Sequence, residues 1–146
     1  MNAIDARASS VVLVDYQARM MPAIHGADDV VARALLLARA AALLEVPVLG
    51  TEQNPERLGP NAGALARWCV QTVPKTHFDA CEDGLLAALD ALAAAHGLRR
   101  LFLSSSLNAV PAYERAGYVA LRRERYQHRS GIHLESVLME KTLPCA

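Results

Sequence analysis

The chain has 146 residues, of which 53% are hydrophobic and 21% are charged, with 15 basic and 15 acidic side chains. This length and apolar content predict one globular domain with a substantial core, and they exclude a disordered chain. The balanced charge gives no general reason to expect nucleic acid or an anionic membrane as a partner.

Cysteine use and the apolar runs bear on the compartment of the protein. The three cysteines are widely spaced and odd in number, unlike a disulfide framework, so we expect a reducing cytoplasmic location. The first ten residues contain charged side chains and lack an apolar core, which predicts no signal peptide. No apolar run reaches membrane-spanning length.

The charge is balanced only in sum. Residues 1–98 hold seven Lys/Arg against eleven Asp/Glu, and residues 99–146 hold eight against four. The surplus therefore changes from four negative to four positive charges near Arg99. Such a step indicates either a boundary or a basic surface on one domain.

The predicted elements alternate between strands and helices. The apolar, mostly β-branched run 11–14 predicts a central parallel strand that is buried on both faces and ends at Asp15. In chain order we then expect a mostly buried helix over 27–44, a strand over 46–51, a loop over 52–60 and a short helix over 61–70. A short strand leading to Lys75 and a helix over 83–96 follow. The last predicted elements are a strand over 101–103, a turn over 104–106, a short helix over 108–116, and strands over 118–126 and 133–141.

This alternation predicts the α/β class. We expect a three-layer, mainly parallel, Rossmann-like sheet with helices on both faces, in which the last two strands are antiparallel. Open sheets of this kind bind ligands at the carboxyl ends of their strands.

Asp15 and Lys75 both follow predicted strands, so we expect both at the carboxyl edge of the sheet. A carboxylate beside a lysine can orient and deprotonate a nucleophile, while the ammonium stabilises the developing charge. A thiol is the most plausible nucleophile for such a pair. Two other interpretations stay open: Asp15 as a helix cap or turn residue, and the pair as a structural ion pair.

Three motifs within residues 11–84 resemble the isochorismatase-like family of cysteine hydrolases. They are Val-Asp-Tyr-Gln at 14–17, Thr-Glu-Gln-Asn-Pro-Glu-Arg-Leu-Gly-Pro at 51–60 and Pro-Lys-Thr-His-Phe-Asp-Ala-Cys at 74–81. The motifs occur in the family's order at sensible spacing. The resemblance implies hydrolysis of a small amide or a related molecule.

The same resemblance implies roles for particular residues. Asp15 and Lys75 would be two members of an aspartate–lysine–cysteine triad, and Gln17 and Gln53 would line the pocket. The nicotinamidase branch of the family carries metal-binding histidines before the lysine, and none stands between residues 25 and 77 here. The chain therefore resembles the metal-free branch, and we expect no metal and no other cofactor for this activity.

The third member of the triad has no counterpart. In that family a Gly-x-Glu-x-His-x-Cys type turn follows the next strand, and its cysteine gains acidity from a helix N-terminus. Here Ser-Ser-Ser-Leu-Asn-Ala-Val-Pro occupies 104–111 instead. Cys69 is interpreted as a packing residue, Cys81 comes too early in the chain, and Cys145 lies in the tail. A serine of 104–106 is a poor substitute, because a hydroxyl needs a stronger base than an aspartate.

The C-terminal part, clearly over 98–143, resembles a GNAT-type N-acetyltransferase. The runs at 100–118 and 136–143 carry this resemblance. It implies that Asn108 contacts the pantetheine arm of acetyl-CoA and that Tyr113 protonates the departing thiolate; the alternatives are a helix cap and core packing, respectively. The family's glycine-rich turn, whose amides hold the pyrophosphate, has no counterpart in residues 1–98, so we expect no tight acetyl-CoA binding.

We interpret the chain as a single α/β domain of hybrid origin. Residues 1–84 are hydrolase-like, residues 85–97 form a junction helix, and residues 98–146 are acetyltransferase-like. Three functions stay open: an impaired hydrolase with a small-molecule substrate, an incomplete acetyltransferase, and a non-catalytic small-molecule-binding or interaction module. We expect no nucleic acid and no membrane partner, and leave a homo-oligomer open.

Overall fold

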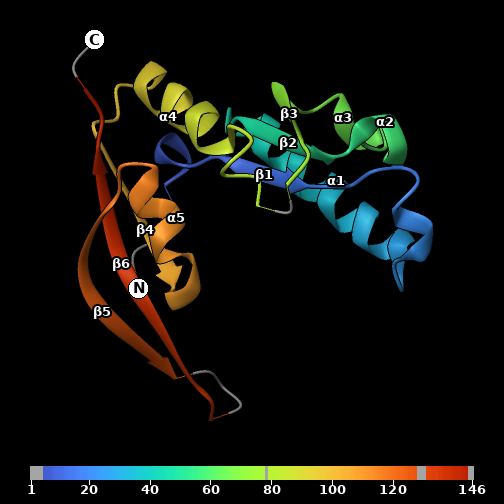
Figure 1. The fold of residues 1–146 in the computed structure, drawn as a ribbon. Helices are drawn as coiled ribbons and strands as arrows, with labels where there is room; N and C mark the ends of the chain where they lie inside the picture. The colour runs from blue at the N-terminus through green and yellow to red at the C-terminus, as the bar shows by residue number, and fades with distance from the viewer. Residues whose placement is uncertain (1–4, 78, 128–130, 145–146) are drawn as a thin grey trace. The chain divides into compact units, whose positions relative to one another are not determined.

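Figure 1 shows the computed structural model, which describes residues 5–77, 79–127 and 131–144. The chain divides into two compact units, Met1–Leu85 and Leu86–Ala146, and contains two separate three-stranded sheets. Helices and strands alternate, so the predicted α/β class is confirmed. Within the described residues, no helix is both long enough and apolar enough to cross a membrane.

The first unit is built on a parallel sheet in the order β1-β2-β3. Its strands are β1 (Val11–Val14), β2 (Val48–Gln53) and β3 (Gln71–Lys75). The predicted central position of the first strand is wrong: β1 lies at the edge of this sheet, and Val14 is 55% exposed. The central strand is β2, in which Val48 to Thr51 are buried and the last two residues are partly buried. An apolar run indicates a tendency to be buried and does not give the order of the strands.

Helix α1 (Ala27–Leu43) and the short α3 (Gly63–Ala66) pack against the sheet in the first core. The buried residues of α1 are three alanines on one helical stripe, Ala34, Ala38 and Ala41. The prediction of a mostly buried helix is wrong, since Leu36 is 69% and Leu43 86% exposed. Because the alanine side chains are small, this stripe packs against the strands, and the larger side chains of Leu36 and Leu43 lie on the solvent-exposed side of the helix.

Three short elements complete the first unit. They are η1 (Ala6–Ala8), η2 (Met21–Ala23) and α2 (Pro55–Leu58). The segments holding η2 and α2 follow β1 and β2, so both lie in connections that leave the carboxyl ends of parallel strands. The turns at this edge are therefore the ones that can shape a site around Asp15.

The second unit is an antiparallel sheet in the order β4-β6-β5. Its elements are α4 (Leu85–Ala95, which starts at the unit boundary), β4 (Arg100–Ser106), η3 (Leu107–Ala109), α5 (Val110–Arg115), β5 (Val119–Gln127) and β6 (His133–Thr142). The predicted antiparallel pairing of the last two strands is confirmed. The predicted turn over 104–106 is wrong, because these serines pair with β6 and extend β4.

These pairings limit the parallel sheet to three strands. After β3 the next strand, β4, pairs antiparallel with β6, so a single mainly parallel sheet is not what the described residues form. The three-layer arrangement with helices on both faces stays a prediction. The single-domain organisation and its internal boundaries also stay predictions.

The second core lies under α5. Tyr118, Val137 and Met139 are buried there, and the ring of Tyr113 meets that of Tyr118 edge to face, with ring centres 5.8 Å apart. Lys141 of β6 forms an ion pair with Asp90, which ties α4 to the same sheet. This unit therefore has its own apolar core and an ion pair that links α4 to its sheet.

Candidate functional site

Asp15 and Lys75 meet at the carboxyl edge of the parallel sheet. Asp15 directly follows β1 and Lys75 is the last residue of β3. The distance between Lys75 Nζ and Asp15 Oδ2 is 2.8 Å, and the two side chains are only 2% and 16% exposed. The expected approach of these two residues is therefore present. A pair this buried needs additional hydrogen bonds to offset the loss of water.

Gln53 and Thr51 supply such hydrogen bonds from the end of β2. Lys75 Nζ donates to Gln53 Oε1 at 2.6 Å, and Gln53 Nε2 donates to the Thr76 carbonyl at 2.9 Å. Thr51 Oγ1 donates to Asp15 Oδ1 at 2.7 Å, so each carboxylate oxygen has a defined partner. This contact and the ion pair hold the Asp15 carboxylate in one orientation.

Asp15 adopts an unusual backbone conformation. Its φ is 57°, in the left-handed region, where aspartate is tolerated better than most residues other than glycine. Its N–H donates to the Thr51 carbonyl at 3.2 Å, so the chain turns sharply while staying attached to β2. Such local strain is concentrated at functional sites, and here it aims the carboxylate at Lys75.

Gln17 is fully buried and clamps the loop after β2. Its Nε2 donates to the carbonyls of Gln53 and Gly59 at 3.0 and 2.6 Å, and its Oε1 accepts from the Gln53 N–H at 2.8 Å. Its amide thus positions Gln53, which in turn holds Lys75. The geometry describes a positioning residue, and substrate contact by Gln17 stays a prediction.

A largely apolar cavity of about 470 Å³ opens beside Asp15. Valines of β1, two methionines and residues of the following turn and helix surround it. The lining side chains are Val12, Val14, Asp15, Tyr16, Met20, Met21, Ile24 and Val30. Asp15 therefore borders a volume in which a small molecule with an apolar part would fit.

The described cysteines are poorly suited to act as nucleophiles. Burial raises the pKa of the Cys69 thiol, and the charge of Glu52 raises it further. Cys81 has a pKa raised to about 11, first by burial and then by a hydrogen bond to Asp79. A nucleophilic cysteine requires the opposite shift, toward a thiolate at neutral pH. Cys145 lies outside the described residues.

Two of the serines at 104–106 have side-chain hydrogen-bond partners within the second unit. Ser105 is 2% exposed, and its Oγ donates to the Ser106 carbonyl at 2.8 Å. Ser104 Oγ lies 3.5 Å from a carboxylate oxygen of Glu124. The Ser104 contact is longer than a nucleophile–base hydrogen bond, and Glu124 is already paired with Arg122, so neither serine is arranged as an activated nucleophile.

Asn108 and Tyr113 lie in the second unit. Asn108 is exposed on η3, and the residues at the capping positions of η3 and α5 are Ser106 and Ala109. The helix-cap interpretation of Asn108 is therefore wrong. Tyr113 packs against the second core, in agreement with the core-packing interpretation.

Sequence reasoning missed Thr51 as part of the site. Its hydroxyl donates to Asp15 from the carboxyl half of β2, where the strand changes from apolar to polar residues, and this change at Thr51 was the available signal. Among the described residues, no cluster of three or more His, Cys, Asp or Glu side chains could hold a metal ion. The absence of a metal from the function stays a prediction.

The fold and the site together define an α/β protein with a buried carboxylate–lysine pair at the carboxyl edge of a parallel sheet. No protein-family model matches the chain. Among curated proteins, the mouse "Isochorismatase domain-containing protein 2A" is 39% identical over 70 residues, which cover 48% of this chain and 34% of the mouse protein. "Isochorismatase domain-containing protein 2" of Danio rerio is 28% identical over 89 residues, covering 61% of this chain and 45% of that protein.

One solved structure supports the fold. The MAR1 ribonuclease of Caenorhabditis elegans is similar with a TM-score of 0.50 and 25% identity, over 53% of this chain and 42% of that one. A GCN5-related N-acetyltransferase structure from Rhodopseudomonas palustris has a TM-score of 0.38 with 36% identity, over 40% of this chain and 36% of that one. That second likeness is too low to support a conclusion.

These matches support an isochorismatase-like fold and relate the chain to isochorismatase domain-containing proteins. The chain spans less than half the length of the curated relatives it matches, 34% and 45% of the two named above.

Proposed function

We propose that the chain is a homologue of the isochorismatase-like cysteine hydrolases that binds a small amide or related molecule but turns it over poorly. The observation that carries this proposal is the buried Asp15–Lys75 pair, 2.8 Å apart at the carboxyl edge of the parallel sheet. Relatives named for an isochorismatase domain support the family to which the proposal appeals.

Asp15 and Lys75 would act on a substrate seated in the cavity beside Asp15. The carboxylate would orient a nucleophile and take its proton, and the ammonium would stabilise negative charge that develops on the substrate carbonyl. Gln53 would keep the Lys75 ammonium in place through its side-chain oxygen. The apolar lining favours a substrate whose reactive amide carries an apolar group.

Turnover would be weak because the pair lacks a suitable nucleophile. Cys81 has a pKa of about 11, so only roughly one thiol in ten thousand is ionised at pH 7. Loss of a nucleophile can cost about a millionfold in turnover, whatever the other groups contribute. The proposal is therefore of a retained binding site with impaired chemistry.

Hydrolysis and binding of small amides test this proposal in one set of variants. The wild type should show near-background hydrolysis that is unchanged in Cys69→Ala and Cys81→Ala. Saturation-transfer NMR should nevertheless detect amide binding that is weakened by Asp15→Asn. Robust turnover abolished by Cys81→Ala would overturn the impaired-chemistry part, and equal amide binding by Asp15→Asn would overturn the location of the site.

For the acetyltransferase-like part we propose no tight acetyl-CoA binding, in spite of the match at Asn108 and Tyr113. The reason is the missing glycine-rich turn, which would supply the main anchor for the pyrophosphate. Calorimetry with acetyl-CoA should detect no binding at micromolar ligand. A low-micromolar dissociation constant would favour the acetyltransferase alternative instead.

The remaining whole-chain proposals rest on sequence alone. They are the hybrid origin, with its change of resemblance between about 84 and 100, and the cytoplasmic location, which follows from the cysteine pattern. A non-catalytic binding or interaction module stays the alternative to the hydrolase, and it differs only in predicting no turnover under any condition.

A further inference from the structure

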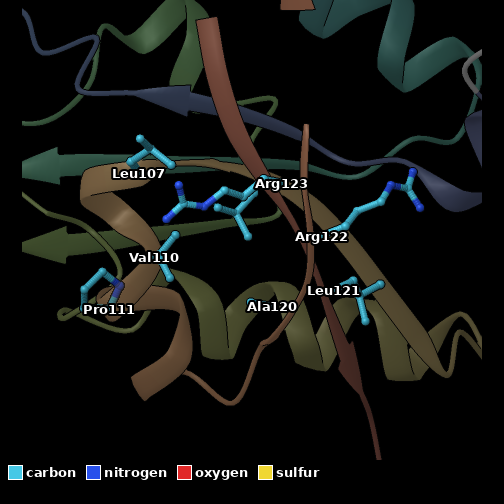
Figure 2. A pocket seen from close by; sticks show the side chains of 8 residues that line it. Leu107, Val110, Pro111, Ala120, Leu121, Arg122 and Arg123 are labelled. Atoms are coloured by element: carbon cyan, nitrogen blue, oxygen red, sulfur yellow. The ribbon is translucent and has the colours of Figure 1, made fainter. Parts of the chain in front are cut away.

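The second unit contains a groove that the proposed hydrolase function does not use. Its volume is about 400 Å³, and it lies between the η3–α5 segment and the β5–β6 hairpin. Leu107, Val110 and Pro111 line it from one side, and Ala120, Leu121 and two arginines line it from β5 (Figure 2). Val137 of β6 completes the lining. The lining is thus mostly aliphatic, with cationic groups at one side.

The two arginines at this groove have different surroundings. Arg122 forms an ion pair with Glu124, with Nη2 and Oε1 2.7 Å apart. The Arg123 side chain is exposed, and it makes no hydrogen bond or ion pair with another residue that the structure describes. Figure 2 shows its side chain extending toward Leu107 and Val110, whereas Arg122 extends in the opposite direction.

The strand register explains this difference. A bulge between Ala120 and Arg122 shifts the alternation of β5, and Arg123 then lies opposite Val137 of β6. Val137 is 7% exposed and belongs to the core face under α5, so Arg123 projects from that face. The acidic Glu135 lies opposite Arg125 instead of Arg123. The guanidinium is therefore flanked mainly by aliphatic side chains.

A guanidinium in such surroundings has a clear ligand preference. It is weakly hydrated and binds a carboxylate through two parallel hydrogen bonds, and the neighbouring aliphatic wall reduces competition from water. One available cation matches one negative charge, so a doubly charged phosphate would remain partly uncompensated. The four-charge positive surplus of residues 99–146 favours anions in general.

We propose that this groove binds a small monocarboxylate with a short aliphatic chain, its carboxylate on Arg123 and its chain along Leu107, Val110 and Val137. The site involves neither Asp15 nor Lys75, so it is independent of the proposed hydrolase function. It also gives a role to the basic character of the C-terminal part.

An NMR titration of the 146-residue chain with hexanoate tests the proposal. Backbone amide signals of Leu107 and Val110 should shift, and affinity should rise from acetate to hexanoate by up to about fourfold per methylene group. Arg123→Gln should weaken hexanoate binding roughly tenfold, which corresponds to about 1.4 kcal/mol. Arg125→Gln removes the same charge from the same strand outside the groove, so it should leave binding nearly unchanged.

Two further probes separate charge from shape. Hexanol should bind much more weakly than hexanoate, and Leu107→Gln should reduce the gain in affinity with chain length while preserving the fold, because Leu107 is 41% exposed. The proposal is overturned if hexanoate causes no shifts, if Arg123→Gln binds it as well as the wild type, or if Arg125→Gln loses as much affinity. Tighter binding of inorganic phosphate than of hexanoate would also overturn it.

Discussion

At the scale of single residues, Asp15 gives a direct test of the buried ion pair. Asparagine tolerates a left-handed φ about as well as aspartate, so Asp15→Asn removes the charge without adding backbone strain. We expect the free energy of unfolding to fall by about 3–5 kcal/mol, because the buried Lys75 ammonium loses the carboxylate beside it. Urea unfolding of wild type and variant measures this difference.

The matched control removes both charges. The double variant Asp15→Asn/Lys75→Met should be less destabilised than the sum of its two single variants, since the pair then buries no charge. A loss below about 1 kcal/mol for Asp15→Asn would contradict the prediction, because that value is typical of an exposed pair.

The thiol of Cys81 provides a second residue-scale prediction. Its pKa of about 11 implies slow alkylation at neutral pH, with a reaction midpoint near that value. In a background with Cys69→Ala and Cys145→Ala, the pH dependence of iodoacetamide labelling measures the midpoint. Asp79→Asn should move it downward, because Asp79 contributes to the raised pKa. A midpoint below the ordinary value of 9.0 would instead indicate an activated thiol.

The proximity of Asp15 and Lys75 could be predicted because the carboxyl ends of parallel strands share one edge. The hydroxyl of Thr51 and the left-handed φ of Asp15 could not, because both depend on how the chain turns after β1. Gln17 was predicted at the site. Whether its side chain faces a ligand or nearby backbone depends on the geometry of the loops, and here it donates to the backbone carbonyls of Gln53 and Gly59.

At the scale of elements, the alanine stripe of α1 sets how closely this helix approaches the sheet. Ala38 is fully buried in the first core. Ala38→Leu should therefore destabilise the protein by about 1–3 kcal/mol, because three more carbons do not fit a filled core. Denaturant midpoints followed by Trp68 fluorescence measure the loss.

Leu36→Ala is the control on the same helix. Leu36 is 69% exposed, so this change should stay within about 0.5 kcal/mol of the wild type. Equal losses at both positions would mean that the leucine face of α1 is covered and the alanine stripe is not the packing surface.

The same helix shows why element positions were predicted better than element burial. Its ends were predicted within a residue, since Asp28 and Asp29 mark the first turn and alanine and leucine favour a helix throughout. The charged residues of α1 lie on the side opposite its alanine stripe, so a signal for the buried face was present. The exposed Leu36 and Leu43 lie on that charged side and made the helix look apolar throughout. The exposure of Val14 was not predicted, because a β-branched run does not show whether a strand pairs with one neighbouring strand or with two.

At the scale of the whole molecule, the step in charge and the change of resemblance both fall between about residues 84 and 100, and the two compact units meet at Leu85. The antiparallel pairing of β4 with β6 could not be predicted from the short apolar run at 101–103, because the three serines that follow look like a turn. Their pairing partners lie thirty or more residues away in the chain, beyond the reach of local patterns.

Two units with separate apolar centres should respond separately to core mutations. Met139 is fully buried in the second core, and Met139→Ala should cost that unit about 2–5 kcal/mol. Trp68, the single tryptophan, packs against the first core, so its fluorescence reports on the first unit alone. Met139→Ala should therefore lower the urea midpoint seen by far-UV circular dichroism and leave the midpoint seen by Trp68 fluorescence unchanged. Ala38→Leu should lower the midpoint seen by Trp68 fluorescence. If both signals instead change in one coincident transition that either variant shifts equally, the two units unfold as one cooperative body and the prediction fails.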